Sequence, residues 1–386
     1  MNIYIQGAAT TKFGELWARS PRSLVKEAAD EALQESGVNK SQIEALYVGN
    51  MLSGILGGQE QLGAMFCEEL GLGNIAAVKV EGACASGGLA VHQAVNALRS
   101  GMYETVMVVG VEKMTDHSPS EVTRALTAAS SDSERWAGAT FPGLYAIMAR
   151  AHMDKYGTTQ EQLAAVAVKN HYHASLNGKA HFTNTITVEQ VLKSSKIADP
   201  LKLLDCSPIS DGASVLILSS KFSRLAGQSS NEVEILASCV ATDSIGLAGR
   251  ESLTSLKATK VASKKAYEMA GLTSKDIDVA EVHDCFTIAE VMAMEDLGFF
   301  KSGEAAGQIE QGITKLGGKG PIVNTSGGLK ASGHPVGATG VKQLVEITNQ
   351  LRGKGDKKQV EGARIGLTHN VGGTGGTAVV HILRSV

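Results

Sequence analysis

Aromatic residues, excess charge of either sign and long apolar runs are all scarce in this chain of 386 residues. It has 8 Phe, 7 Tyr and 2 Trp, and 36 Lys and Arg nearly balance 39 Asp and Glu, for a net charge of −3. A nucleic-acid-binding or anionic-membrane surface needs a clustered basic excess, so neither is expected. The longest apolar runs, such as Val106–Val111, suit a strand rather than a membrane span, and the N-terminus lacks the basic start of a secretory leader.

Cysteine is also sparse, with five residues scattered along the chain and no Cys-x-x-Cys pair. An odd number without that spacing argues against a disulfide framework and a structural zinc site, and indicates a reducing compartment, the cytoplasm. Glycine, by contrast, is abundant, with 44 residues in a background that is 43% apolar. Small residues in an aliphatic core favour a layered α/β enzyme.

Two pairs of segments repeat within the chain. Residues 23–36 and 257–270 both have apolar residues at helical spacing, and both end at a glycine before a short strand. Residues 78–101 and 321–355 both follow the pattern of strand, glycine-rich turn and helix. One such pair can arise by chance between alanine-rich helices, whereas two pairs in the same order indicate a duplicated α/β unit.

A different region separates the two copies. Residues 115–204 are richer in Ser, Thr and His and interrupt the alternation, which predicts an inserted subdomain that covers a ligand site. The alternation resumes at 205, where Ser214–Leu218 is expected to complete the first copy as a strand. The expected domains are therefore 1–114 together with 205–222, the insertion 115–204, and 223–386.

Cys84 lies in the run Gly-Ala-Cys-Ala-Ser-Gly-Gly, after a predicted strand and before a predicted helix. The N–H groups and dipole of a helix N-terminus favour a thiolate, and the same N–H groups can receive an oxyanion. Small neighbours would let a substrate carbonyl approach closely. A buried cysteine in a glycine-packed turn is the alternative interpretation.

His334 lies in Gly-His-Pro-Val-Gly-Ala-Thr-Gly, in the turn that the repeat pairs with the Cys84 turn. If the two turns meet at the centre of a pseudo-symmetric body, an imidazole reaches a thiol, which is the minimum set for an activated nucleophile. A lone histidine in a turn otherwise serves as a surface or capping residue.

Two further motifs carry groups that can bind or move protons. His283 and Cys285 flank Asp284 after a predicted strand, and both can transfer a proton. A metal site there is a weaker alternative, because no further ligand at suitable spacing completes it. Residues 369–376, His-Asn-Val-Gly-Gly-Thr-Gly-Gly, are expected to link two strands as a loop whose N–H groups can hold an anion, although plain hairpin chemistry explains them equally.

Taken together, these motifs resemble the thiolase family. GACASGG, HDCF, GHPVGATG and HNVGGTGG occur in the family's order and spacing, and the resemblance covers nearly the whole chain. HDCF and the run KYGTTQEQLAAVAVKNH are similar to the sterol-carrier-protein-type and archaeal branch. The resemblance implies an α/β thiolase fold, in which two βαβαβαββ halves form a five-layer αβαβα sandwich with an inserted loop domain over the active site.

The resemblance also implies a role for each motif. Cys84 would be the acylated nucleophile, and the backbone N–H groups of Cys84 and Gly372 would form the first oxyanion hole. His334 would activate Cys84 and, with His283, hold the enolate oxygen of the second acyl-CoA. The chain departs from most thiolases at Asn370, where those have a cysteine.

In the branch resembled here, Cys285 would take over the acid–base work of that missing cysteine. The implied activity is acyl-CoA C-acyltransferase, condensing two acetyl-CoA to acetoacetyl-CoA and CoA or cleaving a 3-oxoacyl-CoA by thiolysis. CoA thioesters would be substrates, with no metal or redox cofactor. The expected assembly is a homodimer or dimer of dimers, with other CoA-pathway enzymes as further partners.

Four alternatives to this activity differ in substrate or in catalysis itself. A steroid-side-chain aldolase related to this branch is one, but such proteins typically lack the nucleophilic cysteine that this chain has at Cys84. A longer-chain 3-ketoacyl-CoA thiolase would share every motif. A ketoacyl synthase or hydroxymethylglutaryl-CoA synthase would share the fold and the cysteine but not HDCF and GHPVGATG. A non-catalytic subunit of a CoA-enzyme complex would have no need of Cys84, His283, Cys285 and His334 together.

Overall fold

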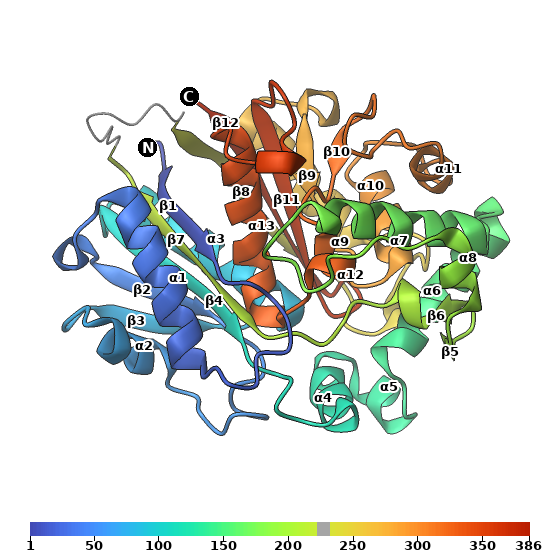
Figure 1. The fold of residues 1–386 in the computed structure, drawn as a ribbon, viewed down its shortest axis with the longest axis horizontal. Helices are drawn as coiled ribbons and strands as arrows, with labels where there is room; N and C mark the ends of the chain where they lie inside the picture. Colours follow the sequence, from blue (N-terminus) through green and yellow to red (C-terminus); the bar gives the residue numbers. More distant parts are fainter. Residues whose placement is uncertain (222–231) are drawn as a thin grey trace.

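The computed structural model describes residues 1–221 and 232–386, so the domain boundary expected at 222/223 lies outside the described residues. Ten strands form one sheet in the order β10-β9-β11-β12-β8-β1-β7-β4-β2-β3 (Figure 1). The sheet consists of two five-stranded halves, which are joined where β1 pairs with β8.

Both halves have the order βαβαβαββ. The first half consists of β1 (Tyr4–Thr10), α1 (Pro21–Ser36), β2 (Ala45–Gly49), α2 (Leu62–Leu70), β3 (Ala76–Val80), α3 (Ser86–Arg99), β4 (Thr105–Glu112) and β7 (Gly212–Ser219). The second consists of β8 (Val233–Thr242), α9 (Lys257–Ala270), β9 (Val279–Glu281), α10 (Thr287–Asp296), β10 (Ile322–Val323), α13 (Val336–Leu351), β11 (Ile365–Gly372) and β12 (Thr377–Ser385). Equivalent strands occupy equivalent positions in the two halves of the sheet. The three strands at each outer edge, β3-β2-β4 and β10-β9-β11, are parallel to one another. The remaining pairs within each half are antiparallel. The predicted duplication of a βαβαβαββ unit is confirmed.

The alternation of side chains along the strands produces the five layers. Val106 and Val108 of β4 pack with α3 and α13 between the two halves of the sheet, whereas Met107 and Val109 face α1 and α2 on the outside. Helices α9 and α10 cover the outer face of the second half. Helices therefore alternate with sheet layers as αβαβα.

The helix ends follow the sequence signals that predicted them. Ser20 caps α1 by accepting a hydrogen bond from the Ser23 N–H, and α1 ends at Gly37 with φ 64°. Its counterpart α9 ends at Gly271 with φ 67°. Both glycines adopt the left-handed conformation that terminates a helix, which explains why the repeat retains a glycine at each position.

The insertion lies between β4 and β7. It contains α4 (Pro119–Leu126), α5 (Asp132–Trp136), α6 (Phe141–Tyr156), α7 (Gln160–Ser175), α8 (Val188–Lys193) and the short pair β5 (Lys196–Ala198) and β6 (Leu201–Lys202). Helices α6 and α7 pack against α10 of the second half, so the insertion covers one side of the body (Figure 1). Within the described residues, every helix is too short or too polar to cross a membrane.

The local structure differs from the prediction at two motifs. Strand β11 continues through Gly372, because it pairs with β12 along its whole length, so His369 and Asn370 are strand residues rather than loop residues. A short helix, α12 (Gly328–Ser332), separates β10 from His334. The His334 turn therefore joins two helices, not a strand and a helix.

Candidate active site

Glycines at the N-termini of α3 and α13 bring the Cys84 turn and the His334 turn together. A Cβ atom on Gly87 would lie 2.7 Å from the Gly337 carbonyl oxygen, and one on Gly340 would lie 2.1 Å from the Gly88 nitrogen. Any side chain at these positions would therefore push the helices apart. This backbone contact explains how two turns that lie far apart in the sequence share one site.

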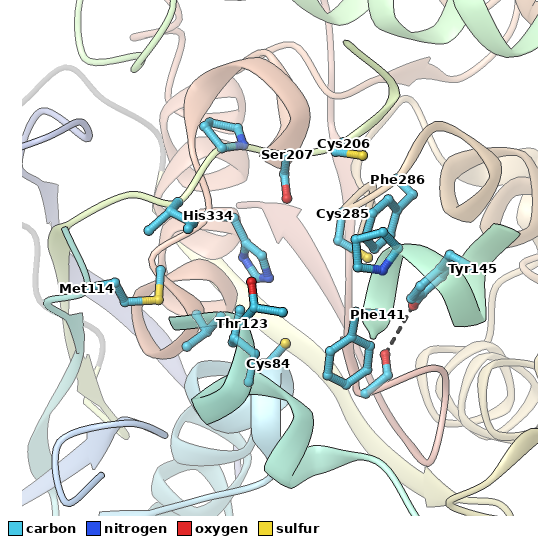
Figure 2. A pocket seen from close by; sticks show the side chains of 16 residues that line it. Cys84, Met114, Thr123, Phe141, Tyr145, Cys206, Ser207, Cys285, Phe286 and His334 are labelled. Carbon is cyan, nitrogen blue, oxygen red and sulfur yellow. Dashed lines mark hydrogen bonds between the residues drawn. The ribbon is translucent and has the colours of Figure 1, made fainter. Parts of the chain in front are cut away.

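Three of the predicted side chains form a tight cluster. The ligand-type atoms of Cys84, His283 and His334 all lie within 4.8 Å of one another, and all three residues are buried. The rings of His283 and His334 meet edge to face, with centroids 5.1 Å apart. The fourth residue, Cys285, lines the same cavity as Cys84 and His334 (Figure 2).

The cavity has a volume of about 200 Å³ and a mostly apolar lining. The insertion and the segment that follows it supply much of its wall, so the predicted covering role agrees with its position. Figure 2 shows the other labelled side chains that line the cavity with Cys84, Cys285 and His334. They are Met114, Thr123, Phe141, Tyr145, Cys206, Ser207 and Phe286. A mostly apolar lining lowers the local dielectric constant and so strengthens electrostatic interactions within the cavity.

Cys84 occupies a strained turn. Ala83, the residue before it, has φ 54°, a left-handed conformation that is uncommon for alanine. The Ser86 hydroxyl supports this turn by donating to the Ala83 carbonyl at 2.6 Å and accepting from the Gly82 N–H at 3.0 Å. The strain places the sulfur at the entrance to α3.

The resting form of Cys84 is the thiol. Burial raises its pKa to about 12, and the charge of Glu112 adds to this, whereas hydrogen bonds from the backbone N–H groups of Gly373 and Cys84 oppose it. The thiolate expected at a helix N-terminus is therefore wrong for the resting site, because desolvation outweighs the backbone dipoles. The N–H group beside the sulfur is that of Gly373, whereas Gly372 lines a neighbouring pocket.

Thr339 determines which nitrogen of His334 can take a proton. The Thr339 hydroxyl lies 2.7 Å from His334 Nδ1 and donates its own hydrogen to the Pro335 carbonyl at 3.0 Å. With its hydrogen on that carbonyl, the hydroxyl accepts from Nδ1–H, which leaves the lone pair on Nε2. Burial lowers the pKa of His334 to about 3, so the ring is neutral at neutral pH and Nε2 is available as a base.

The buried Nε2 atom of His283 has no hydrogen-bond partner among the described residues. The pKa of His283 lies well below the usual range, first because of burial and then because of His334 and His369, so the ring is neutral. Since buried polar atoms are nearly always paired, the Nε2 atom is suited to a bound ligand.

Tyr145, from α6 of the insertion, joins Cys285 to the loop after β11. It is 1% exposed, and its hydroxyl donates to the Gly373 carbonyl at 3.1 Å (Figure 2). It is also hydrogen-bonded to Cys285, whose pKa burial raises well above the usual range. The sequence contains no signal for this residue, because its contacts come from loop segments that are distant in the sequence.

Glu112, at the end of β4, is a second residue that the motifs did not reveal. Its buried carboxylate accepts from the Asn50 side chain and from the backbone N–H groups of Met51, Leu52 and Gly337. Burial raises its pKa to about 7, although these bonds act in the opposite direction. The bond to Gly337 fixes the first turn of α13, directly after His334.

Asp284, between His283 and Cys285, serves a structural purpose. Its carboxylate accepts from the backbone N–H groups of Leu329 at 2.6 Å and Lys330 at 3.2 Å, and from the Asn170 side chain at 2.7 Å. Burial raises its pKa to about 7. Asp284 thus ties the start of α12 and the insertion to the HDCF segment.

The fold also assembles a set of metal-binding atoms that the sequence spacing did not suggest. Near His283 the sequence shows no further ligand, yet Cys84 and His334 arrive from other segments. A thiolate and two imidazoles suit a soft cation such as zinc. A cation bound there would occupy the Cys84 sulfur and the two imidazole nitrogens, so these atoms could not react with another group.

Comparisons with known proteins agree with the fold. Family models match residues 3–221, as the thiolase N-terminal domain, and residues 239–385, as a thiolase C-terminal domain-like region. The chain is 49% identical to an acetyl-CoA acetyltransferase of Methanothermobacter thermautotrophicus over 99% of both chains. It is 33% identical to human sterol carrier protein 2, over 99% of this chain and 72% of that protein. The structure of the Acat5 thiolase from Ascaris suum in complex with coenzyme A is similar over the full length of both chains, with a TM-score of 0.74 and 19% identity.

Proposed function

The chain belongs to the thiolase family and is an acyl-CoA C-acyltransferase, and we propose that Cys84 carries the acyl group while Cys285, His283 and His334 move protons and hold the enolate. The reaction joins two acetyl-CoA molecules into acetoacetyl-CoA and CoA, or runs in reverse as thiolysis. The observation that supports these roles is that Cys84, Cys285 and His334 line one cavity, while the ring of His283 lies within 4.8 Å of the reactive atoms of Cys84 and His334.

The first half-reaction acylates Cys84. His334 Nε2 takes the thiol proton as the sulfur attacks the thioester carbonyl carbon, and the carbonyl oxygen becomes an oxyanion. The backbone N–H groups of Cys84 and Gly373, which act to lower the pKa of the sulfur, are the donors proposed for it. The bond from carbon to the CoA sulfur then breaks, and the Cys285 thiol gives its proton to the departing CoA.

The second half-reaction forms the carbon–carbon bond. Cys285, now a thiolate, takes an α-proton from acetyl-CoA, and the enolate oxygen is held by His283 and by the protonated His334. The enolate carbon attacks the acyl carbon, the bond to Cys84 breaks, and His334 returns its proton to that sulfur. All protons are thereby restored. A donor of this kind typically contributes about 10²- to 10³-fold in rate.

The cavity favours short acyl groups. A volume of about 200 Å³ lies below the roughly 300–1,000 Å³ of pockets for drug-sized ligands, and bulky side chains such as Phe141 and Phe286 line it. Acetyl and acetoacetyl groups are therefore the proposed acyl substrates, in preference to longer chains. A matched series of 3-oxoacyl-CoA substrates tests this, since kcat/KM should fall as the chain lengthens.

The insertion carries arginine side chains that are suited to bind the phosphate groups of CoA. Thr123 lines both the reactive cavity and an adjoining surface pocket, and that pocket also contains Arg124 and Arg135. Guanidinium groups bind phosphates in bidentate fashion. We expect Arg124→Ala and Arg135→Ala to raise the KM for CoA with little change in kcat.

The cytoplasmic location and the dimeric or higher assembly stay predictions.

Turnover of acetoacetyl-CoA and CoA tests the proposal. We expect the wild-type protein to consume the 3-oxoacyl-CoA and release acetyl-CoA, and Cys84→Ala to be inactive while remaining folded. Absence of turnover, together with a Cys84 that gains no acetyl group from acetyl-CoA, would instead identify a non-catalytic subunit.

A further inference from the structure

Asn370 lies at the centre of the site, on β11, and contacts both the nucleophile segment and His283. It is 1% exposed. Its Oδ1 atom accepts from the Gly88 N–H at 3.1 Å, and its Nδ2 group donates to the Cys84 carbonyl at 3.0 Å. The same Nδ2 group lies 3.3 Å from His283 Nδ1.

Two neighbours fix the orientation of this amide. The Gly88 N–H can only donate, so it must face the amide oxygen, and the Cys84 carbonyl can only accept, so it must face the amide NH₂. The space around the amide is also closed. A Cβ atom on Gly340 would lie 2.3 Å from Asn370 Oδ1, and one on Gly88 would lie 3.0 Å from it.

The orientation of Asn370 in turn determines the proton position on His283. An NH₂ group can only donate, so His283 Nδ1 must accept and carries no hydrogen. An imidazole whose Nδ1 accepts has its one N–H on Nε2. That is the buried atom without a hydrogen-bond partner among the described residues.

We infer that Asn370 is a positioning residue that holds His283 in the Nε2–H form, so that the enolate oxygen meets a hydrogen-bond donor. This inference rests on the function proposed above. It explains how two neutral imidazoles with centroids 5.1 Å apart can differ in chemistry. Thr339 leaves a lone pair on Nε2 of His334, which begins as a base, whereas Asn370 leaves a proton on Nε2 of His283, which acts as a donor.

Asn370→Asp is the sharpest perturbation, because the side chains have nearly the same shape. A carboxylate keeps the bond from Gly88, but it accepts where the amide donated, so His283 must move its proton to Nδ1. The enolate oxygen would then face a lone pair. We expect the condensation step to slow by about 10²- to 10³-fold, and acetylation of Cys84 to slow only as far as the lost bond to the Cys84 carbonyl disturbs the nucleophile.

Nitrogen NMR of histidine-labelled protein reads the proton position directly, since protonated and unprotonated ring nitrogens differ strongly in chemical shift. The His283 signals are assigned by their loss in His283→Gln. We expect Nε2 to be protonated in the wild-type protein and Nδ1 in Asn370→Asp. Gln343→Glu makes the same change from amide to carboxylate at a buried neighbour that donates to the His369 carbonyl, and should leave the His283 signals unchanged.

Several results would overturn the inference. If the wild-type spectrum shows His283 protonated on Nδ1, the inference is refuted without any variant. The inference therefore remains testable even if Asn370→Asp does not fold. In folded Asn370→Asp, an unchanged proton position on His283, or a changed proton position with normal condensation, also contradicts it. If the wild-type protein shows neither condensation nor thiolysis, the proposed function fails, whereas the spectrum still decides the role of Asn370.

Discussion

Replacing Thr339 by valine removes one hydroxyl and keeps the shape of the side chain. In the wild-type site this hydroxyl accepts from His334 Nδ1–H at 2.7 Å, within a fully buried turn. A buried donor without a partner costs about 1–3 kcal/mol, so the ring is expected to move its proton to Nε2, where it faces the pocket. The population with a free lone pair on Nε2 then falls by about 5- to 150-fold, since 1.36 kcal/mol corresponds to tenfold.

The rate of Cys84 acetylation reports this population. Rapid mixing of Thr339→Val with acetyl-CoA should show acetyl-enzyme forming about 5- to 150-fold more slowly than in the wild-type protein. Thr339→Ser retains the hydroxyl and should restore most of the rate. If folded Thr339→Val acetylates at the wild-type rate, Thr339 does not orient the base and the proton assignment for His334 is wrong.

Three further predictions concern charge, stability and the covering insertion. Because the pKa of Cys84 is about 12, its alkylation by iodoacetamide should accelerate about tenfold per pH unit above neutrality, and a plateau near pH 7 would contradict this. In Glu112→Gln, one carboxylate oxygen that accepts from backbone N–H groups is replaced by an NH₂ group, which donates. The free energy of unfolding measured in urea should therefore fall by about 1–3 kcal/mol. An unchanged free energy would show that the bond to Gly337 is dispensable. Tyr145→Phe removes the bond to Cys285 and should lower kcat by about 2- to 10-fold with little change in KM, whereas an equal rise in KM would indicate a role in substrate binding.

The repeat made most of the fold predictable from the sequence. Gly37 and Gly271 end equivalent helices, and their adjoining strands occupy equivalent places in the sheet. The same logic paired the turns of Cys84 and His334, because a duplicated unit with a central two-helix layer places equivalent helix N-termini side by side. Local pattern was less reliable at residues 369–376, where pairing with β12 extends the strand that the glycines seemed to end.

Other features of the site depend on tertiary contacts that no local pattern records. Tyr145 reaches Gly373 across 228 positions of sequence, and Glu112 reaches Gly337 across 225. The charge state of Cys84 was misjudged for the same reason. A helix N-terminus is visible in the sequence, whereas the burial that outweighs it is created by the insertion and by the second half of the chain.

Mass spectrometry of the protein mixed briefly with acetyl-CoA tests the central claim most directly. The account predicts that the intact protein gains the mass of one acetyl group, with release of one CoA, and that digestion places this group on Cys84. Cys84→Ala should gain nothing. An acetyl group on Cys285 or elsewhere, or turnover without any acylated protein, would contradict the account.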